Sequence, residues 1–207
     1  MKKTIYMTRH GNTVSNNQKI YAGWSSEGLS EDGILQAEKL GERMANLKIS
    51  AIYSSPIQRA VQSSQILNKH IKGDMIIESD IREIEMGPWE GLTEDEVAAK
   101  YPAHYQIWLT NPAELKIDGR ETLQDVLKRG LRAIKKMLVK EQDDSILLVS
   151  HVAIIRCLLL HFNQLPLNSY KTIHIPNICT YMAIFDGEQG NTARTLTDVC
   201  KPQTIGA

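Results

Sequence analysis

The sequence predicts an α/β fold, a three-layer sandwich with a mostly parallel central sheet and a small helical cap insertion. Three observations predict it. Short segments with the composition of strands alternate with helical patterns along the chain. Residues 145–149 (SILLV) form an almost uninterrupted apolar run, as expected for a central strand covered on both faces. A stretch rich in aromatic and polar residues, at about 93–119, interrupts the alternation and predicts the cap.

The length and composition indicate one compact domain over residues 1–207, long enough to bury a sizeable core. Hydrophobic residues make up 42% of the chain and charged residues 23%, which is usual for a soluble globular protein. The 24 basic and 24 acidic side chains cancel, so we expect no broad attraction to nucleic acid or to an anionic membrane. Any anion-binding site must therefore be local.

The N-terminus and the cysteines bear on the compartment. The first residues run directly into a predicted strand and lack the long apolar stretch and cleavage site of a signal peptide. Cys157, Cys179 and Cys200 are far apart and show no metal-ligand spacing, so we interpret them as free thiols, with Cys157 buried in a helix. The longest apolar run, 152–160, is interrupted by Arg156 and too short to span a bilayer. We expect a cytoplasmic protein.

The first half of the chain predicts three strands and two helices. The strands are residues 4–8 (TIYMT), 50–54 (SAIYS) and 74–78 (DMIIE). Ser30 is the predicted N-cap of the first helix, and Pro56 is placed in the first turn of the second. Apolar residues recur at helical spacing in the first of these helices, at Ile34, Ala37, Leu40, Met44 and Leu47.

The second half begins with the cap, where Pro102 and Pro112 break the segment into short helices. Thr122 then caps a long amphipathic helix. Its apolar positions are Leu123, Val126, Leu127, Leu131, Ile134 and Leu138. Residues 152–161 predict a buried helix after the apolar strand, and residues 180–185 and 193–199 predict two late strands.

Polar and cationic residues follow three of the predicted strands. Arg9-His10-Gly11 follows the first, Ser54-Ser55-Pro56 the second and Ser150-His151 the apolar strand. Ligands of parallel α/β folds bind beyond the carboxyl ends of the strands, so we expect Arg9, His10, Arg59 and His151 to share one anion-binding pocket. Each residue alone is more often structural than catalytic. Together they supply the charge that many phosphoryl-transfer enzymes obtain from a metal, because planar guanidinium groups bind phosphate oxygens bidentately.

Five motifs follow one another in order along the chain. They are Arg9-His10-Gly11-Asn12-Thr13 with Asn16, Leu29-Ser30-Glu31-Asp32-Gly33 with Gln36-Ala37, residues 53–60 (YSSPIQRA), residues 83–91 (EIEMGPWEG), and Gly119-Arg120-Glu121-Thr122 with Ser150-His151. With these motifs the chain resembles the histidine phosphatase superfamily, also called phosphoglycerate mutase-like, over almost its whole length. The resemblance implies a metal-independent phosphatase of small phosphate monoesters.

The resemblance also implies a role for each matching residue. His10 is the expected nucleophile, transiently phosphorylated, and Arg9, Arg59 and His151 are the expected phosphate clamp. Glu83 is the expected proton donor and later base. Asn16 and Thr13 are expected as accessory residues of the phosphate pocket. We expect no metal, since no set of carboxylates and histidines has convincing metal-ligand spacing, and no other cofactor.

Glu85 is a rival for the acid. Only Glu83 lies four residues before Gly87, as the family pattern requires, so we favour Glu83. The role itself follows from the chemistry, because a leaving alkoxide needs a proton and a nearby carboxylic acid can give it.

The chain departs from the family pattern at three places. Ser26 and Gly28 replace an Asp and a Pro, Val152 replaces the Gly that often follows the second His, and Arg120 replaces a small residue. Each change can reshape the substrate pocket. We expect Gly23, Trp24 and Val152 to bind substrate with Asn16 and Thr13. Arg120 is interpreted as a solvated loop residue, with contact to a ligand carboxylate as the alternative.

Two other functions remain open at this point. Phosphoglycerate mutases of the family share these motifs but are typically longer, and a catalytically silent phospholigand-binding module would be expected to lack the nucleophile or the acid. The segment Tyr21-Ala22-Gly23 and the length favour α-ribazole phosphatases somewhat; sugar phosphates, phosphoserine and phosphoglycerate stay open as substrates. The expected partner is a small phosphorylated metabolite rather than nucleic acid or a membrane, and a homodimer is left open.

Overall fold

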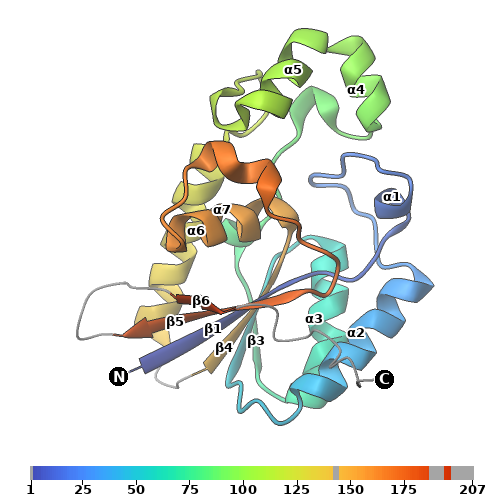
Figure 1. Ribbon diagram of the computed structural model, residues 1–207. Coiled ribbons are helices and arrows are strands. Elements are labelled where there is room, and N and C mark those ends of the chain that lie inside the picture. Colours follow the sequence, from blue (N-terminus) through green and yellow to red (C-terminus); the bar gives the residue numbers. More distant parts are fainter. Residues whose placement is uncertain (1, 142–144, 187–193, 197–207) are drawn as a thin grey trace, which may run out of the picture.

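The computed structural model describes residues 2–141, 145–186 and 194–196 of the chain. A six-stranded sheet, in the order β3-β2-β4-β1-β5-β6, lies between helices on both faces (Figure 1). The strands are β1 (Lys2–Arg9), β2 (Ala51–Ser54), β3 (Asp74–Ile77), β4 (Ser145–Ser150), β5 (Thr180–Asp186) and β6 (Arg194–Leu196). Strands β1 to β4 run parallel, whereas β5 is antiparallel to β1 and to β6. The predicted fold class is confirmed.

Strand β4 lies in the middle of the parallel part of the sheet. It pairs with β1 on one side and with β2 on the other, and residues 146–149 have no exposed surface. Arg9 at the end of β1 lies opposite Ser150, and Ser54 at the end of β2 lies opposite Val149. The carboxyl ends of three strands therefore meet at one edge, as the apolar composition of β4 led us to expect.

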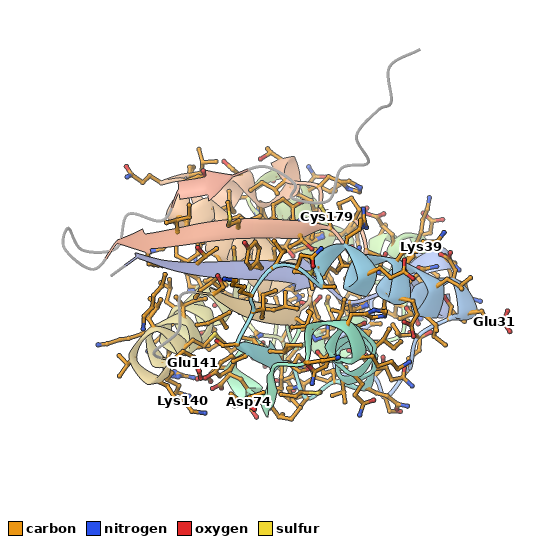
Figure 2. All side chains as sticks on the ribbon, turned by 90° about the horizontal axis from the view of Figure 1, so that it is seen from below. Glu31, Lys39, Asp74, Lys140, Glu141 and Cys179 are labelled. Carbon is orange, nitrogen blue, oxygen red and sulfur yellow. The ribbon has the colours of Figure 1, made fainter. Side chains whose placement is uncertain are left out.

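Four long helices cover the sheet. Helices α2 (Glu31–Met44) and α3 (Gln58–Ile71) pack on one face, and α6 (Leu123–Lys140) and α7 (Val152–Phe162) on the other. Figure 2 shows Lys39 of α2 and Lys140 of α6 on opposite sides of the molecule. These two hydrophobic cores hold the strand ends in fixed positions.

Local sequence signals set where the helices begin. The Ser30 side chain accepts a hydrogen bond of 3.1 Å from the Gly33 N–H, which confirms Ser30 as an N-cap. Thr122 caps α6 through a capping box with Asp125. Cap residues act through hydrogen bonds to the next turn, so a sequence pattern can predict them.

Two predicted details of the helices are wrong. Helix α3 begins at Gln58 and not at Pro56, because the Ser55 hydroxyl accepts a hydrogen bond from the Ile57 N–H and keeps this segment in a turn. Ile34 is 44% exposed. The buried residues of α2 are Gly33, Ala37, Leu40, Gly41 and Met44, a stripe that begins one position earlier than predicted.

The cap consists of α4 (Glu94–Lys100), α5 (Pro102–Thr110) and a 3-10 helix, η3 (Pro112–Glu114). In Figure 1 it stands at the top of the view, above α6 and α7. Pro102 and Pro112 occupy first positions of helices, where the missing N–H leaves no hydrogen bond unmade. The cap is joined to the sandwich by aromatic contacts, which place Trp108 against Trp89 and Tyr170.

The late strands and the cysteines are described in part. Residues 180–185 lie in β5 as predicted, and Arg194–Leu196 forms β6, whereas the rest of the predicted last strand lies outside the described residues. Cys157 and Cys179 are both buried, and Cys157 is a free thiol; Cys200 falls outside the described residues. Within the described ranges, no helix is long and apolar enough to cross a membrane.

Candidate active site

The two histidines predicted at strand ends lie side by side. His10 follows β1, and its N–H donates a hydrogen bond of 3.0 Å to the Ser150 carbonyl at the end of β4. His151 follows β4, and its ring centroid is 5.1 Å from that of His10. Both side chains are almost fully buried. The parallel pairing of β1 with β4 thus brings together two residues that are far apart in the sequence.

The hydrogen bonds of His10 fix its tautomer. Nδ1 lies 2.7 Å from the Gly11 carbonyl oxygen, which can only accept, so Nδ1 carries the proton. Nε2 accepts a hydrogen bond of 3.1 Å from Nε of Arg59 and therefore keeps its lone pair. Burial, followed by the nearby charges of Arg59 and Arg9, lowers the pKa of His10 well below its usual value. The imidazole is neutral, with Nε2 available for a nucleophilic attack.

Arg59 comes from the first turn of α3 and is 2% exposed. Its Nη2 donates hydrogen bonds of 3.0 Å to the Ala22 carbonyl and 2.8 Å to the Gly23 carbonyl. The Gly23 N–H in turn binds the Glu90 carboxylate at 2.9 Å. Arg59 therefore joins the loop that contains Gly23 to His10, the predicted nucleophile.

His151 is held by Ser55, the residue that follows β2. Its Nε2 lies 2.7 Å from Ser55 Oγ, while Nδ1 is buried without a hydrogen-bond partner among the described residues. Burial, followed by the charges of Arg59, His10 and Arg9, lowers the pKa of His151 well below its usual value. A buried polar nitrogen without a partner costs free energy, so Nδ1 is a candidate contact for a bound ligand.

Arg9, at the end of β1, is the second arginine of this site, after Arg59. Its Nη1 donates a hydrogen bond of 2.9 Å to the Ile175 carbonyl, and its buried Nε has no partner in the described part of the chain. Burial is the main cause that lowers the pKa of Arg9 to about 10, and the charges of Arg156 and Arg59 act in the same direction. Crowded guanidinium groups with unpaired donors form a receptor for an anion.

Glu83 is the carboxylate of this site. It is 6% exposed, and its Oε1 accepts hydrogen bonds of 2.8 Å from the Ile84 N–H and 3.1 Å from the Ala153 N–H. The charge of Glu83 acts on both Arg9 and Arg59. Glu85 is half-buried, and its backbone N–H donates a hydrogen bond of 3.0 Å to the Glu121 carboxylate. The hydrogen bond from the Ala153 N–H places the Glu83 carboxylate beside the chain segment that follows His151, so Glu83 stays the predicted acid.

The structure brings together two histidines, two arginines and one carboxylate near the ends of parallel strands, and the five sequence motifs led us to expect these residues there. The family model of the histidine phosphatase superfamily (branch 1) matches residues 5–198. The chain belongs to the histidine phosphatase superfamily.

Known proteins agree with this assignment. A bifunctional protein of Mycobacterium tuberculosis is 33% identical over 156 residues, which are 75% of this chain but only 43% of that protein. Phosphoserine phosphatase 1 of Hydrogenobacter thermophilus is 26% identical over 196 residues, covering 95% of this chain and 92% of that protein. The solved structure of Bacillus stearothermophilus YhfR matches with a TM-score of 0.88 and 26% identity, covering 94% of this chain and 96% of that one.

In this member of the histidine phosphatase superfamily, Arg129 holds the segment that contains Glu83, and the sequence did not reveal this role. From α6, Arg129 donates hydrogen bonds to the carbonyls of Asp80 (2.9 Å), Arg82 (2.6 Å) and Glu83 (3.0 Å). Its Nε also pairs with the Glu121 carboxylate at 2.9 Å. Because Arg129 touches the backbone of Glu83 and not its carboxylate, we interpret it as a positioning residue.

Asn177 is a second residue that the sequence did not reveal. Its Nδ2 donates hydrogen bonds to the His10 carbonyl (3.1 Å) and to Oδ1 of Asn16 (2.9 Å). Asn16, predicted for the phosphate pocket, lines a cavity of about 390 Å³ together with Arg9, Tyr21 and Asn177. No local pattern around residue 177 predicts these contacts, because both partners lie at the other end of the sequence.

The other predicted substrate-binding residues have distinct surroundings. Thr13 is buried, and its hydroxyl caps α1 (Val14–Asn17) by accepting from the Asn16 N–H. Trp24 is 40% exposed, and its indole N–H donates a 2.8 Å hydrogen bond to the Glu83 carbonyl. Val152 is the first residue of α7 and is half-buried. The Gly23 carbonyl accepts a hydrogen bond from Arg59. Contact with substrate stays a prediction for Thr13, Gly23, Trp24 and Val152.

Arg120 is not the solvated loop residue that we expected. It is 7% exposed, and its guanidinium carbon lies 5.1 Å and 4.8 Å from the ring centroids of Trp89 and Trp108. The chain turns inward just before it, at Gly119, which has a φ of +75°. The ion pair between Glu121 and Arg129 fixes the residue that follows, so Arg120 is carried beneath the cap.

Two glycines let the nucleophile loop approach α2. A Cβ on Gly33 would lie 2.1 Å from the Asn12 carbonyl oxygen, and one on Gly11 would lie 2.5 Å from the Gly33 carbonyl oxygen. The Asn12 carbonyl also accepts a 2.9 Å hydrogen bond from the Ser30 N–H. The first two sequence motifs are therefore two sides of one backbone contact that positions the loop after His10.

Metal independence stays a prediction for this site. Across the described residues, no group of three or more His, Cys, Asp or Glu side chains is placed to hold a metal ion. The prediction therefore requires a chelation experiment.

Proposed function

We propose that the chain is a metal-independent phosphatase of small phosphate monoesters that forms a phosphohistidine at His10. The observation that carries the proposal is the neutral His10 ring, with its proton on Nδ1 and the lone pair of Nε2 beside Arg59. A neutral imidazole surrounded by cations is suited to attack a phosphate dianion, because the cations neutralise the charge that would repel the nucleophile.

In the first step, Nε2 of His10 attacks phosphorus while the bond between phosphorus and the leaving oxygen breaks. Protonated Glu83 gives its proton to that oxygen, and the product alcohol departs. In the second step, the Glu83 carboxylate takes a proton from water as the water oxygen attacks the phosphohistidine. The P–N bond breaks, and neutral His10 and inorganic phosphate result. Glu83 is again protonated, so the cycle closes.

The clamp residues stabilise the transferred group in both steps. Arg9 and His151 each have a buried nitrogen without a hydrogen-bond partner among the described residues, and Arg59 lies beside Nε2 of His10, so these three residues are the candidates to bind the phosphoryl oxygens. Asn16 adds an amide from the adjoining cavity. A donor that faces developing negative charge is commonly worth about 10²–10³ in kcat. The name of the Hydrogenobacter relative supports a phosphatase reaction and makes phosphoserine a candidate substrate; α-ribazole phosphate and sugar phosphates are further candidates.

The test is the loss of the nucleophile. We expect His10→Ala to fold, as judged by circular dichroism, but to lose turnover of a panel of phosphate monoesters. Quenching the wild type without acid during turnover should trap phosphate on His10. Appreciable turnover by the folded variant would refute the proposal.

Two further measurements define the reaction class. Release of inorganic phosphate distinguishes a phosphatase from a mutase, which would yield an isomeric monoester instead. Exhaustive chelation should leave activity intact. Loss of activity with EDTA and its recovery with Mg²⁺ or Zn²⁺ would contradict metal independence.

A further inference from the structure

A row of three aromatic side chains runs beneath the cap. Trp89, Trp108 and Tyr170 form this aromatic row, with ring centroids 6.1 Å apart for the first pair and 5.2 Å for the second. Two cations lie on the middle ring: the guanidinium carbon of Arg120 and Nζ of Lys171 are each 4.8 Å from the Trp108 centroid. Two positive charges therefore share one indole.

Among the described residues, Arg120 lacks the anion that a buried charge normally requires, and the exposed Lys171 has no anionic partner either. Arg120 donates through Nη1 to the Glu121 carbonyl at 3.1 Å, but its Nε and Nη2 are buried without hydrogen-bond partners. Neither Arg120 nor Lys171 forms an ion pair with a carboxylate of the described residues. Arg129, by contrast, has Glu121. The face of an aromatic ring offsets only part of the cost of removing a guanidinium from water.

The cations also act on one another. Burial, followed by the positive charges of Arg156 and Arg120, lowers the pKa of Lys171 in spite of the opposing effect of Glu94. Arg156 lies over Tyr170, 4.8 Å from its ring centroid, and its buried Nε has no partner among the described residues. Mutual repulsion of this kind is unfavourable in the empty protein, and a bound anion would relieve it.

Tyr21 connects the aromatic row with the cavity that Arg9 and Asn16 line. Tyr21, which lines the cavity of about 390 Å³ with Arg9, lies 5.6 Å from Trp89 between ring centroids. The charge of Glu83 acts on Arg120 as it does on Arg9. A substrate whose phosphate is bound at His10 would thus extend its leaving group past Glu83 toward the row.

We propose that Arg120 and Lys171 form a subsite for a second anionic group, a carboxylate or a phosphate, carried by the leaving group of the substrate. The preferred substrates are then phosphate monoesters that bear such a group, and neutral monoesters are poor ones. The inference rests on the proposed phosphatase activity. Arg120 supplies the planar fork that carboxylates and phosphates bind, and Lys171 supplies a mobile point charge at the exposed end.

The experiment compares three substrates that differ in the second group. They are 3-phosphoglycerate with a carboxylate, 1,3-propanediol bisphosphate with a phosphate, and glycerol 3-phosphate with neither. Hydrolysis of p-nitrophenyl phosphate is measured in parallel as a reference for the phosphatase itself. We expect wild-type kcat/KM to be higher for at least one of the two esters that bear a second anionic group than for glycerol 3-phosphate. The ester with the higher kcat/KM identifies that group as a carboxylate or a phosphate.

The variants are Arg120→Met, which keeps a long side chain between the indoles, and Lys171→Met at an exposed position. A hydrogen bond to a charged group typically corresponds to about 10- to 100-fold, so each variant should reduce the ratio of kcat/KM between charged and neutral esters by that factor. Lys116→Met, at an exposed position of the same region, is the matched control and should leave the ratio unchanged. If Arg120→Met does not fold, the ratio of kcat/KM measured for Lys171→Met tests the subsite on its own.

The outcomes separate the two proposals. If the wild type hydrolyses p-nitrophenyl phosphate but shows equal kcat/KM for the three esters, or if the folded variants keep the wild-type ratio, the subsite is refuted and the phosphatase stands. If no ester is hydrolysed, the proposed function fails and the subsite fails with it.

Discussion

Nε of Arg59 donates a hydrogen bond of 3.1 Å to Nε2 of His10, the atom that we propose attacks phosphorus. Arg59 therefore orients the His10 ring and, through its positive charge, opposes protonation of that ring. It also lies next to the position at which we propose that the phosphate binds. The same side chain fixes the carbonyls of Ala22 and Gly23. Replacement of Arg59 thus affects both charge and geometry.

Arg59→Ala should lower kcat by about 10²–10³, because a donor that faces the developing charge is removed. Arg59→Lys should recover only part of this loss, since an ammonium cannot reproduce the fork of a guanidinium. Steady-state kinetics on folded variants measure both effects. Gln58→Ala, its exposed neighbour in α3, is the matched control. A loss below about threefold for Arg59→Ala would indicate a structural arginine.

Glu83→Gln should discriminate between leaving groups. The amide oxygen of Gln can still accept from the Ile84 and Ala153 N–H groups, so the fold should persist. We expect kcat/KM for an alkyl phosphate to fall by roughly 10²–10⁴. The fall for p-nitrophenyl phosphate should be much smaller, because nitrophenolate leaves without a proton.

The quantity kcat/KM is essential here, since it reports only the steps up to the phosphoenzyme. Glu85→Gln provides the comparison at the rival position. Equal losses for the two ester types in Glu83→Gln would assign the proton to another group, with Glu85 the next to test.

Arg129→Met should displace the backbone of Glu83 and leave the Glu121 carboxylate without its partner. We expect a loss of roughly 3–5 kcal/mol in the free energy of unfolding, as for other broken buried pairs. Activity toward alkyl esters should fall more than activity toward aryl esters, as in Glu83→Gln. The effects of the two substitutions should not add, because they act on one function.

Arg132→Met is the control for Arg129→Met. Arg132 is 53% exposed and pairs with Asp80 at the surface, so its loss should cost at most about 1 kcal/mol. If Arg129→Met lowered kcat/KM equally for both ester types, Arg129 would only support the fold.

The stability of the protein should decrease on mild acidification. Burial lowers the pKa of both His10 and His151 below the unfolded value, so below about pH 6.5 the unfolded chain binds protons that the folded protein does not. Stability therefore rises with pH in this range, by up to about 1.4 kcal/mol per pH unit for each histidine. Urea unfolding between pH 5 and 7.5 measures the slope.

His10→Gln should make that slope shallower, because one of the two buried imidazoles is removed. His161→Gln, at an exposed position, should keep the wild-type slope. Indistinguishable slopes in wild type and His10→Gln would mean that His10 does not contribute.

The parts of the molecule that sequence predicts well are those set by local chemistry or by sheet geometry. Ser30 and Thr122 act on their own first turns. His10 and His151 could be placed together because carboxyl ends of parallel strands share one edge. Prediction from the sequence failed where a long side chain contacts a segment that is distant in the sequence. A charged residue in an amphipathic helix normally faces solvent, so nothing near Arg129 revealed that it turns inward.

The prediction that Arg120 is a solvated loop residue was wrong for a related reason. An arginine after a glycine in a polar segment is typical of a surface loop, and its burial depends on Trp89 and Trp108, which belong to other segments. Pro56 illustrates a smaller error. Proline suits the first turn of a helix, but the Ser55 hydroxyl accepts a hydrogen bond from the Ile57 N–H, and the helix begins two residues later, at Gln58.

The place of β1 in the sheet has a consequence for biosynthesis. Strand β1 leaves the ribosome before the other strands of this sheet, whereas both of its partners, β4 and β5, are translated only after β2 and β3. Ile5 and Met7 of β1 therefore lack their neighbouring strands until β4 and β5 have been translated. Such delayed, non-local pairing slows folding and exposes nascent chains to aggregation, which makes them clients for chaperones. His10 and His151 meet only when β4 docks, so no nascent chain that lacks β4 can assemble the catalytic pair.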